Sequence, residues 1–231
     1  MLLTELLGRK VLDAGGEPVG RVADIAVELW EPEPVLSRLV LRSGRREPLR
    51  EVPWMAVEAL GPPMRLRAGA TPAVAAALER EGELLLAAHV LDRQIFDARG
   101  MRLRRVGDLE LVTADGASRL LAAEVGAAAL FRRVGLRRLA KAFSAEVVDW
   151  VDLHIASGPG HRLQLRSRAA GVHRLSAEQL AALAARLPET RADEVLGAVE
   201  STRSNAARRL VPRVLEKRRR GPLRLRRRAP S

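Results

Sequence analysis

Carboxylate side chains recur in this chain in a pattern that could do chemistry. Asp24 and Asp108 occupy the same place in two copies of one sequence motif, and a pair of such carboxylates could serve as an acid/base or metal site. Recurrence in a duplicated fold also indicates a repeated structural role, such as pairing with Arg21 and Arg105 on solvated strands. We interpret the two carboxylates as structural.

Four further carboxylates belong to a helical segment near the C-terminus. They are Glu178, Glu189, Asp193 and Glu194. Mg²⁺ is a hard cation that prefers oxygen ligands and water, so these side chains are candidate magnesium ligands. A solvated helix face is the favoured interpretation of the same pattern, and bound Mg²⁺ is the alternative.

Other residues that enzyme chemistry would need are scarce. The chain has no cysteine, which excludes thiolate nucleophiles, disulfides and cysteine metal sites. Its four histidines have no metal-ligand spacing, and neither a phosphate-binding loop nor a GxSxG motif is present. The histidines are His89, His154, His161 and His173. The sequence therefore predicts a protein that is not an enzyme, with no catalytic residue and no cofactor other than the Mg²⁺ alternative.

The recurring carboxylates are placed by an internal repeat. Lys10 to Val27 aligns without a gap on Gln94 to Leu111, 84 positions later, with six identical pairs among eighteen. The motif residues are Asp13, Gly16, Arg21 and Asp24 in the first copy and Asp97, Gly100, Arg105 and Asp108 in the second. Trp54 and Trp150 close the copies in one frame, followed by Met64 to Arg67 and His161 to Gln164. Two units of one kind stand in tandem.

Short strands are expected within each copy. Val19 to Leu29 alternates between two faces, and Val35 to Leu41 is rich in residues that favour strands. The segments beginning at Asp13 and Asp97 predict hairpin turns, in which the Asp accepts a local backbone N–H and Gly16 or Gly100 takes a positive φ. Several short strands separated by such turns predict a small barrel for each copy.

Two helical segments are predicted around the second copy. Thr71 and Pro72 can begin an alanine-rich linker helix over 70–82 that Gly82 ends. An insertion over 127–143 has apolar residues at helical spacing (Leu130, Val134 and Phe143), five basic residues and no acid. Such a helix can pack on its own barrel, which is the favoured interpretation, or lie on an anionic membrane or an acidic partner.

After the second copy the apolar period becomes helical. Ser176 to Gln179 has the spacing of a capping box, Pro188 begins a second helix, and a third follows near 205–216. These helices form a short array.

Positive charge is concentrated at the C-terminal end. The net charge is +12, but residues 201–231 hold twelve basic residues and one acid, so the preceding 200 residues carry only +1. Self-repulsion over 216–231 predicts a disordered tail that binds polyanions without specificity. The candidate polyanion-binding residues are Lys217, Arg218, Arg219, Arg220, Arg224, Arg226, Arg227 and Arg228.

The motifs described so far resemble a known family. Gly8 to Asp13, Gly20 to Asp24 and Val52 to Trp54 resemble a PRC-barrel, the β-barrel shared by the photosynthetic reaction centre H subunit and a ribosome maturation factor. Leu91 to Asp97 and Arg105 to Asp108 resemble the second barrel of bacterial proteins that fuse such barrels to the cytosolic N domain of MgtE magnesium transporters. Leu175 to Val199 is similar to that N domain. The resemblance implies a role in magnesium sensing or transport.

The predicted fold class is mainly β plus α: two tandem small PRC-like β-barrels followed by a short all-α helical-hairpin segment and a disordered basic tail. The expected domains are barrel 1 over 1–69, the linker helix over 70–82, barrel 2 over 83–168 with the insertion over 127–143, the MgtE-N-like helices over 169–215, and the tail over 216–231.

These observations predict a non-enzymatic cytosolic regulatory or adaptor protein, linked through the resemblance to magnesium transport or homeostasis. Its expected partner is a protein, for which a transporter or other membrane protein is a candidate, and a homo-oligomer is compatible with the sequence. No apolar run is long enough for a transmembrane segment, so the predicted location is cytoplasmic, with the inner membrane face as an alternative. An RNA- or ribosome-associated binding protein and a peripheral membrane-surface scaffold remain alternative functions. Scarce aromatic residues (3%) argue against single-stranded RNA recognition.

Overall fold

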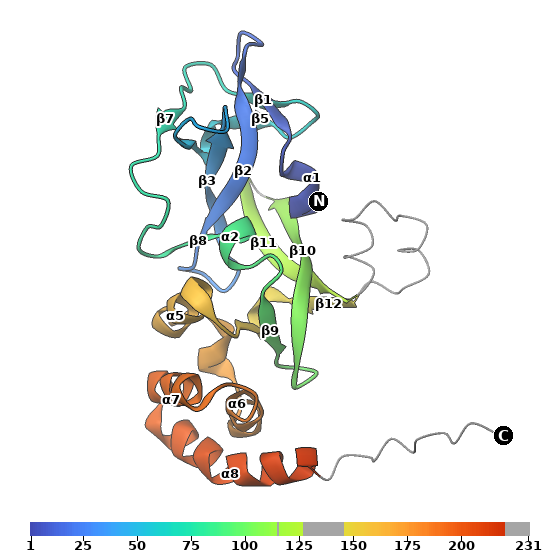
Figure 1. Cartoon of the computed structure of the whole chain (residues 1–231), viewed down its shortest axis with the longest axis vertical. Helices are drawn as coiled ribbons and strands as arrows, with labels where there is room; N and C mark the ends of the chain where they lie inside the picture. The colour runs from blue at the N-terminus through green and yellow to red at the C-terminus, as the bar shows by residue number, and fades with distance from the viewer. Residues whose placement is uncertain (115, 127–145, 220–231) are drawn as a thin grey trace, which may run out of the picture. The chain divides into compact units, whose positions relative to one another are not determined.

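The computed structural model describes residues 1–114, 116–126 and 146–219 (Figure 1). The chain forms two compact units, Met1–Arg174 and Leu175–Ser231. The first is built mainly from strands and the described part of the second from helices, which confirms the mixed β and α content. No helix among the described residues has the length and apolarity needed to cross a membrane.

The elements of the first unit follow the two repeats. The first copy contains α1 (Leu3–Leu6), β1 (Lys10–Leu12), β2 (Pro18–Glu28), β3 (Val35–Arg42), β4 (Arg50–Pro53), the 3₁₀ turn η1 (Trp54–Ala56), β5 (Val57–Ala59) and β6 (Met64–Leu66), and β7 (Ala73–Val74) follows it. The second copy contains β8 (Glu83–Leu85), α2 (Leu86–His89), β9 (Gln94–Asp97), β10 (Arg102–Ala114), β11 (Ala117–Val125), β12 (Glu146–Asp149), η2 (Trp150–Asp152) and β13 (Leu153–Ile155). The unit ends with α5 (Gly158–Arg166) and η3 (Gly171–Arg174).

Strand register shows that the duplication extends well beyond the motif. In the hairpin of β2 and β3, Val22 pairs with Leu41; in that of β10 and β11, Val106 pairs with Val125, 84 positions later in both strands. From Asp24 to Glu28, each β2–β3 pair has a counterpart 84 positions later in the β10–β11 hairpin, and both register shifts recur. The pairing of β4 with β3 also corresponds to that of β12 with β11. Here the residues of β3 and β11 are 84 positions apart, whereas those of β4 and β12 are 96 positions apart. The extra residues therefore lie between β11 and β12. The basic helix predicted over 127–143 falls there, outside the described residues.

The prediction of two closed barrels is wrong, because the strands form one open sheet. Its main path runs β13-β9-β10-β11-β3-β2-β1-β6-β5, with the two hairpins side by side in Figure 1. The halves join where Val35 of β3 pairs with Arg119 of β11, and these two residues are themselves 84 positions apart. Residue i thus meets its own repeat, as at a two-fold axis. A single buried cluster contains apolar residues of both copies.

Both predicted hairpin turns form, with one difference. Asp13 Oδ1 accepts the backbone N–H of Glu17 at 2.9 Å and Asp97 Oδ1 accepts that of Gly100 at 2.8 Å. Gly16 takes a positive φ of 88°, as expected. In the second turn the left-handed residue is Met101 (φ 47°) and not Gly100.

The linker helix predicted over 70–82 does not form. Ala73 and Val74 are instead the strand β7, paired with β4. Downstream, the buried guanidinium of Arg38 donates to the carbonyl of Leu78 at 2.6 Å, and it also forms ion pairs with Glu51 and Glu83. A short isolated helix is marginal in water, so these hydrogen bonds to the sheet outweigh its local preference.

The two tryptophans occupy equivalent places, as the repeat predicts. Each begins a 3₁₀ turn, Trp54 directly after β4 and Trp150 directly after β12, and the two residues are 9% and 2% exposed. The frame fails one element later. Met64 to Leu66 is the strand β6, whereas His161 lies in α5, because Pro159 stands in the first turn of that helix and Gly160 packs closely against Ile155.

The second unit contains three helices among its described residues: α6 (Ala177–Ala184), α7 (Glu189–Ala198) and α8 (Ser201–Arg219). The capping box is confirmed, since the Gln179 backbone N–H donates to Ser176 Oγ and the Ser176 N–H donates to Gln179 Oε1. Pro188 precedes α7 as predicted. The third helix is longer than expected, so the first part of the predicted tail, from Glu216 to Arg219, is helical; residues 220–231 lie outside the described residues.

Replacing either tryptophan by alanine should destabilise the first unit by about 3 kcal/mol or more, because a large buried ring is removed from the shared core. Chemical denaturation of Trp54→Ala and Trp150→Ala measures the loss. A change near zero in either variant would contradict a core role for that ring.

Candidate functional site

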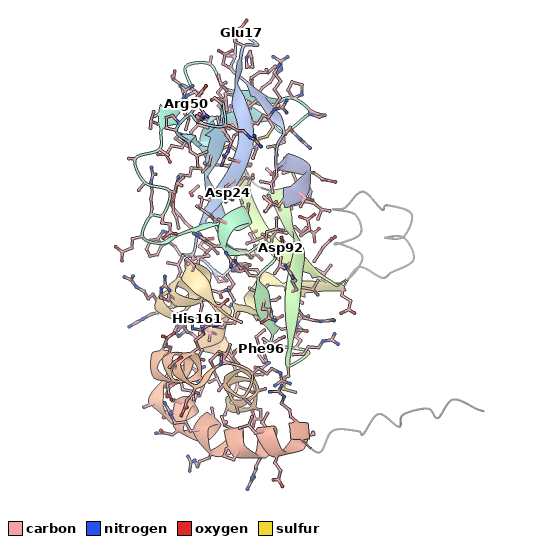
Figure 2. All side chains as sticks on the ribbon, in the orientation of Figure 1. Glu17, Asp24, Arg50, Asp92, Phe96 and His161 are labelled. Carbon is pink, nitrogen blue, oxygen red and sulfur yellow. The ribbon has the colours of Figure 1, made fainter. Side chains whose placement is uncertain are left out.

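Asp24 caps a helix that belongs to the other copy. It lies on β2, is 7% exposed, and its Oδ1 accepts the backbone N–H groups of Ile25 and Ala87, each at 2.7 Å. Its Oδ2 accepts the N–H of Ala88 at 3.0 Å. Ala87 and Ala88 form the first turn of α2, beside which Asp24 is labelled in Figure 2. The carboxylate therefore binds helix donors that have no partner within the helix.

Asp108 repeats this role in the opposite direction. It lies on β10, is 3% exposed, and its Oδ1 accepts the N–H of Leu109 at 2.8 Å and that of Thr4 at 3.1 Å. The Thr4 hydroxyl donates to the other carboxylate oxygen. Thr4 belongs to α1, at the start of the first copy. Each copy thus holds the leading helix of the other.

This arrangement excludes the proposed ion pairs with arginine. Arg21 donates to the carbonyl of Gly8 at 3.0 Å, and Arg105 lies 3.8 Å from a carboxylate oxygen of Asp92. Both arginines approach the same turn of their own copy, at residues 84 positions apart. The expectation of a solvated Asp–Arg pair was wrong, because backbone N–H groups in a buried site bind the carboxylate instead.

The bound carboxylates offer little for catalysis. Burial raises the pKa of Asp24, and the backbone N–H groups of Ala87, Ile25 and Ala88 act in the opposite direction. Those three donors already occupy both oxygens of the side chain. Asp24 and Asp108 are therefore structural caps, in agreement with the structural interpretation of the repeat.

Three histidines gather in the first unit, which the sequence spacing did not predict. His154 Nε2 and His161 Nδ1 lie 2.9 Å apart, and His161 Nδ1 lies 3.1 Å from the carbonyl of Ile155. His173 Nε2 lies 2.9 Å from the carbonyl of Leu165. Burial, together with the nearby His161 and His173, lowers the pKa of His154 to about 3. His154 is therefore neutral near pH 7. Its Nδ1 is buried and has no hydrogen-bond partner among the described residues.

The candidate magnesium ligands of the helical segment do not form a site. All four carboxylates are exposed. Asp193 lies 2.9 Å from the guanidinium of Arg208, and the Ser176 hydroxyl donates to Glu178 at 2.8 Å. Hydrogen bonds from the backbone N–H of Glu178 itself and from the Ser176 side chain lower the pKa of Glu178. In the part of the chain that is described, no three His, Cys, Asp or Glu side chains group to hold a metal ion. Glu189 and Glu194 are on α7, the helix of Asp193. The residues present do not fit a Mg²⁺ site.

The candidate polyanion-binding residues begin on α8. Lys217 and Arg218 are exposed there, and Arg218 donates to the carbonyl of Ala185 at 2.6 Å. Arg219 ends the helix. The other candidates, from Arg220 to Arg228, lie outside the described residues.

An apolar groove opens over the tryptophan turn of the first copy. Its volume is about 480 Å³, and Met55 on its wall is 81% exposed. Trp54, Val57 and Leu60 line it together with Thr113 and Ser118 at the tip of the β10–β11 hairpin. Glu58 and Arg67 add one charge of each sign.

The equivalent surface of the second copy is covered. All three residues of β13 are buried, whereas those of β5 are half-buried or exposed. η3 lies on η2 so closely that a Cβ on Gly171 would stand 2.0 Å from the carbonyl oxygen of Val151. α5 lies on β13, where a Cβ on Gly160 would stand 2.6 Å from Ile155 Cδ1. Small residues thus allow two segments to pack on a surface that the first copy leaves open.

Neither a scan of protein-family models nor a search of curated proteins finds a match to this chain.

Removing the Asp24 carboxylate should destabilise the second copy, where its helix donors lie. Asp24→Ala leaves three backbone N–H groups without their acceptor, and we expect a loss of about 3 kcal/mol or more. Hydrogen exchange should accelerate at Ala87 and Ala88. Asp13→Ala, which removes a half-buried turn carboxylate of the first copy, is the control and should leave these amides protected. If the amides of Ala87 and Ala88 stayed equally protected in Asp24→Ala, Asp24 would not be the cap of α2.

His154 should make the first unit less stable as the pH falls. Its pKa is about 3 in the folded chain and near 6.5 in the unfolded chain, so the unfolded state takes up the proton first. The contribution of neutral His154 is present above pH 6.5 and is lost progressively from pH 6.5 toward pH 3. Between pH 7 and pH 5 it should cost about 2 kcal/mol. Urea unfolding at both pH values measures this, and His154→Gln should abolish that part of the difference. An equal pH dependence in both proteins would refute the assignment.

Proposed function

We propose that the chain is a non-enzymatic adaptor that binds a protein partner in the groove over Trp54 and Met55. The observation that carries this proposal is the difference between the two copies. One surface accepts segments of the chain itself, and its counterpart, built from the equivalent 3₁₀ turn, stays open with Met55 81% exposed. Apolar surface of this kind marks interaction sites on soluble proteins.

The covered surface indicates the chemistry of the partner. The segment that packs on η2 presents Ala170, Gly171 and Val172, all of which are buried. Glycine allows close approach of the backbone, and the aliphatic side chain fills the space beside the tryptophan turn. A partner for the first copy therefore presents a turn or short helix with small residues and one aliphatic side chain.

An adaptor role also agrees with how the ionisable residues are used. Asp24 and Asp108 cap helices, and Arg38 is held between Glu51 and Glu83. The resemblance to PRC-barrels linked to MgtE-type N domains makes a divalent-cation transporter, or another membrane protein, the partner class to test first. Since the helical carboxylates do not fit a Mg²⁺ site, the adaptor acts by docking, and any response to the metal belongs to the partner.

The test compares two methionines that differ in their surroundings. Met55→Asp places a charge in the groove, while Met101→Asp makes the same change at an exposed turn of the second copy, where Met101 is 44% exposed. The free energy of unfolding of both variants should lie within about 0.5 kcal/mol of the wild-type value. In quantitative affinity purification after cross-linking in the native host, Met101→Asp should retain a membrane-protein partner and Met55→Asp should lose it at least tenfold. Equal recovery with both variants would exclude the groove as the docking site.

A further inference from the structure

Helix α8 has one side packed within its own unit. Ser204 and Ala207 are buried, and Val211 and Val214 are half-buried, at spacings of three and four residues. Residues so spaced share one helix face, and α8 lies against α6 and α7. This face accounts for the folding of the helix.

The side turned away from that face carries a line of positive charge. Arg209, Arg213 and Lys217 are all exposed and follow one another at intervals of four residues. At a rise of about 1.5 Å per residue, the three side chains are spaced about 6 Å apart along the helix. We name these three residues the α8 stripe.

The charge of the stripe is only partly offset nearby, because one acid, Glu216, lies three residues after Arg213 on the same side of the helix. Arg208, on the flank of the helix, pairs with Asp193, and Arg203 pairs with Glu200. Among the described residues, no ion pair involves Arg209, Arg213 or Lys217. Like charges four residues apart on a helix repel one another. The helix dipole favours Lys217 in the last turn but has no such effect at Arg209, ten residues before the end of the helix. The stripe therefore destabilises the free helix, and an anionic surface would relieve the repulsion.

An apolar side chain beside the stripe distinguishes between anionic partners. Leu210, three residues before Arg213 and seven before Lys217, lies on the same side of the helix and is half-buried. A leucine flanked by long basic side chains suits the boundary between headgroups and acyl chains, where the cations reach the phosphates. The sequence from residue 175 to the C-terminus contains no aromatic residue. Single-stranded nucleic acid would lack a stacking platform on this unit.

We propose that the α8 stripe binds the phosphate and carboxylate groups of an anionic phospholipid bilayer, with Leu210 beside it at the interface. The net positive charge and the neighbouring apolar side chain on one helix face carry this inference, and it is independent of the groove of the first unit. The chain is then held at a membrane surface by its second unit.

The experiment measures partitioning of the full chain onto vesicles at 0.15 M salt. Vesicles of 30% phosphatidylserine in phosphatidylcholine are compared with vesicles of phosphatidylcholine alone. The stripe variant is Arg209→Gln, Arg213→Gln and Lys217→Gln, which keeps good helix formers at all three positions. A basic residue near an anionic surface contributes about fivefold, so the partition coefficient on anionic vesicles should fall roughly 100-fold. Leu210→Ser should weaken binding further without changing the net charge.

A charge-matched control separates the stripe from the total charge. Arg42→Gln, Arg45→Gln and Arg46→Gln remove the same charge from exposed positions of the first unit and should reduce partitioning less than threefold. Circular dichroism melting checks that both variants keep their helices. An equal loss in the two variants, wild-type binding by the stripe variant, or equal binding to neutral vesicles would each overturn the proposal. So would a larger effect of the stripe on a uridine 20-mer than on the vesicles.

Discussion

Each half of the β unit depends on a carboxylate that the other half supplies. The helices α1 and α2 have only four residues each, too few to be stable alone, and the first-turn N–H groups that Asp108 and Asp24 bind are partly buried. These hydrogen bonds cross the junction of the copies. Because a partly buried donor without an acceptor is costly, neither copy is complete by itself. This exchange accounts for one sheet and one core where the repeat alone suggested two barrels.

Symmetry is strict where the two copies depend on each other and fails where they meet the surroundings. The hairpin registers, the capping carboxylates and the tryptophan turns all correspond. The additions do not: α5 and η3 cover the second copy, while β6 joins β5 to β1 in the first. When one of two duplicated surfaces is covered and the other is open, a binding site can arise on the open one without a new fold. The proposed docking site at Met55 lies on the open surface of this pair.

Local signals in the sequence predicted local structure well. The turn at Asp13, the capping box at Ser176 and the frame of the tryptophans all rest on residues close in sequence. Contacts between distant residues were not predictable in this way. Alignment at a fixed offset identifies equivalent residues but does not say which copy a side chain binds, so Asp24 and Asp108 were expected to pair with arginines of their own copy and not to cap a helix of the other. The predicted linker helix does not form because Arg38 and β4 bind the backbone of that segment. The histidine cluster was not predicted because α5 stands where the repeat suggested a strand.

Several charged side chains are buried and bound within the first unit, whereas those of the α8 stripe in the second unit are exposed to solvent. In the first unit, buried ions such as Asp24 and Arg38 are bound inside the fold, and the groove offers mainly apolar contacts that act only at short range. In the second unit the exposed cations of α8 attract a charged surface from about a Debye length away. Under the two proposals, a partner protein in the same membrane would meet the groove at a raised effective concentration, so that a modest groove affinity would be enough for stable docking.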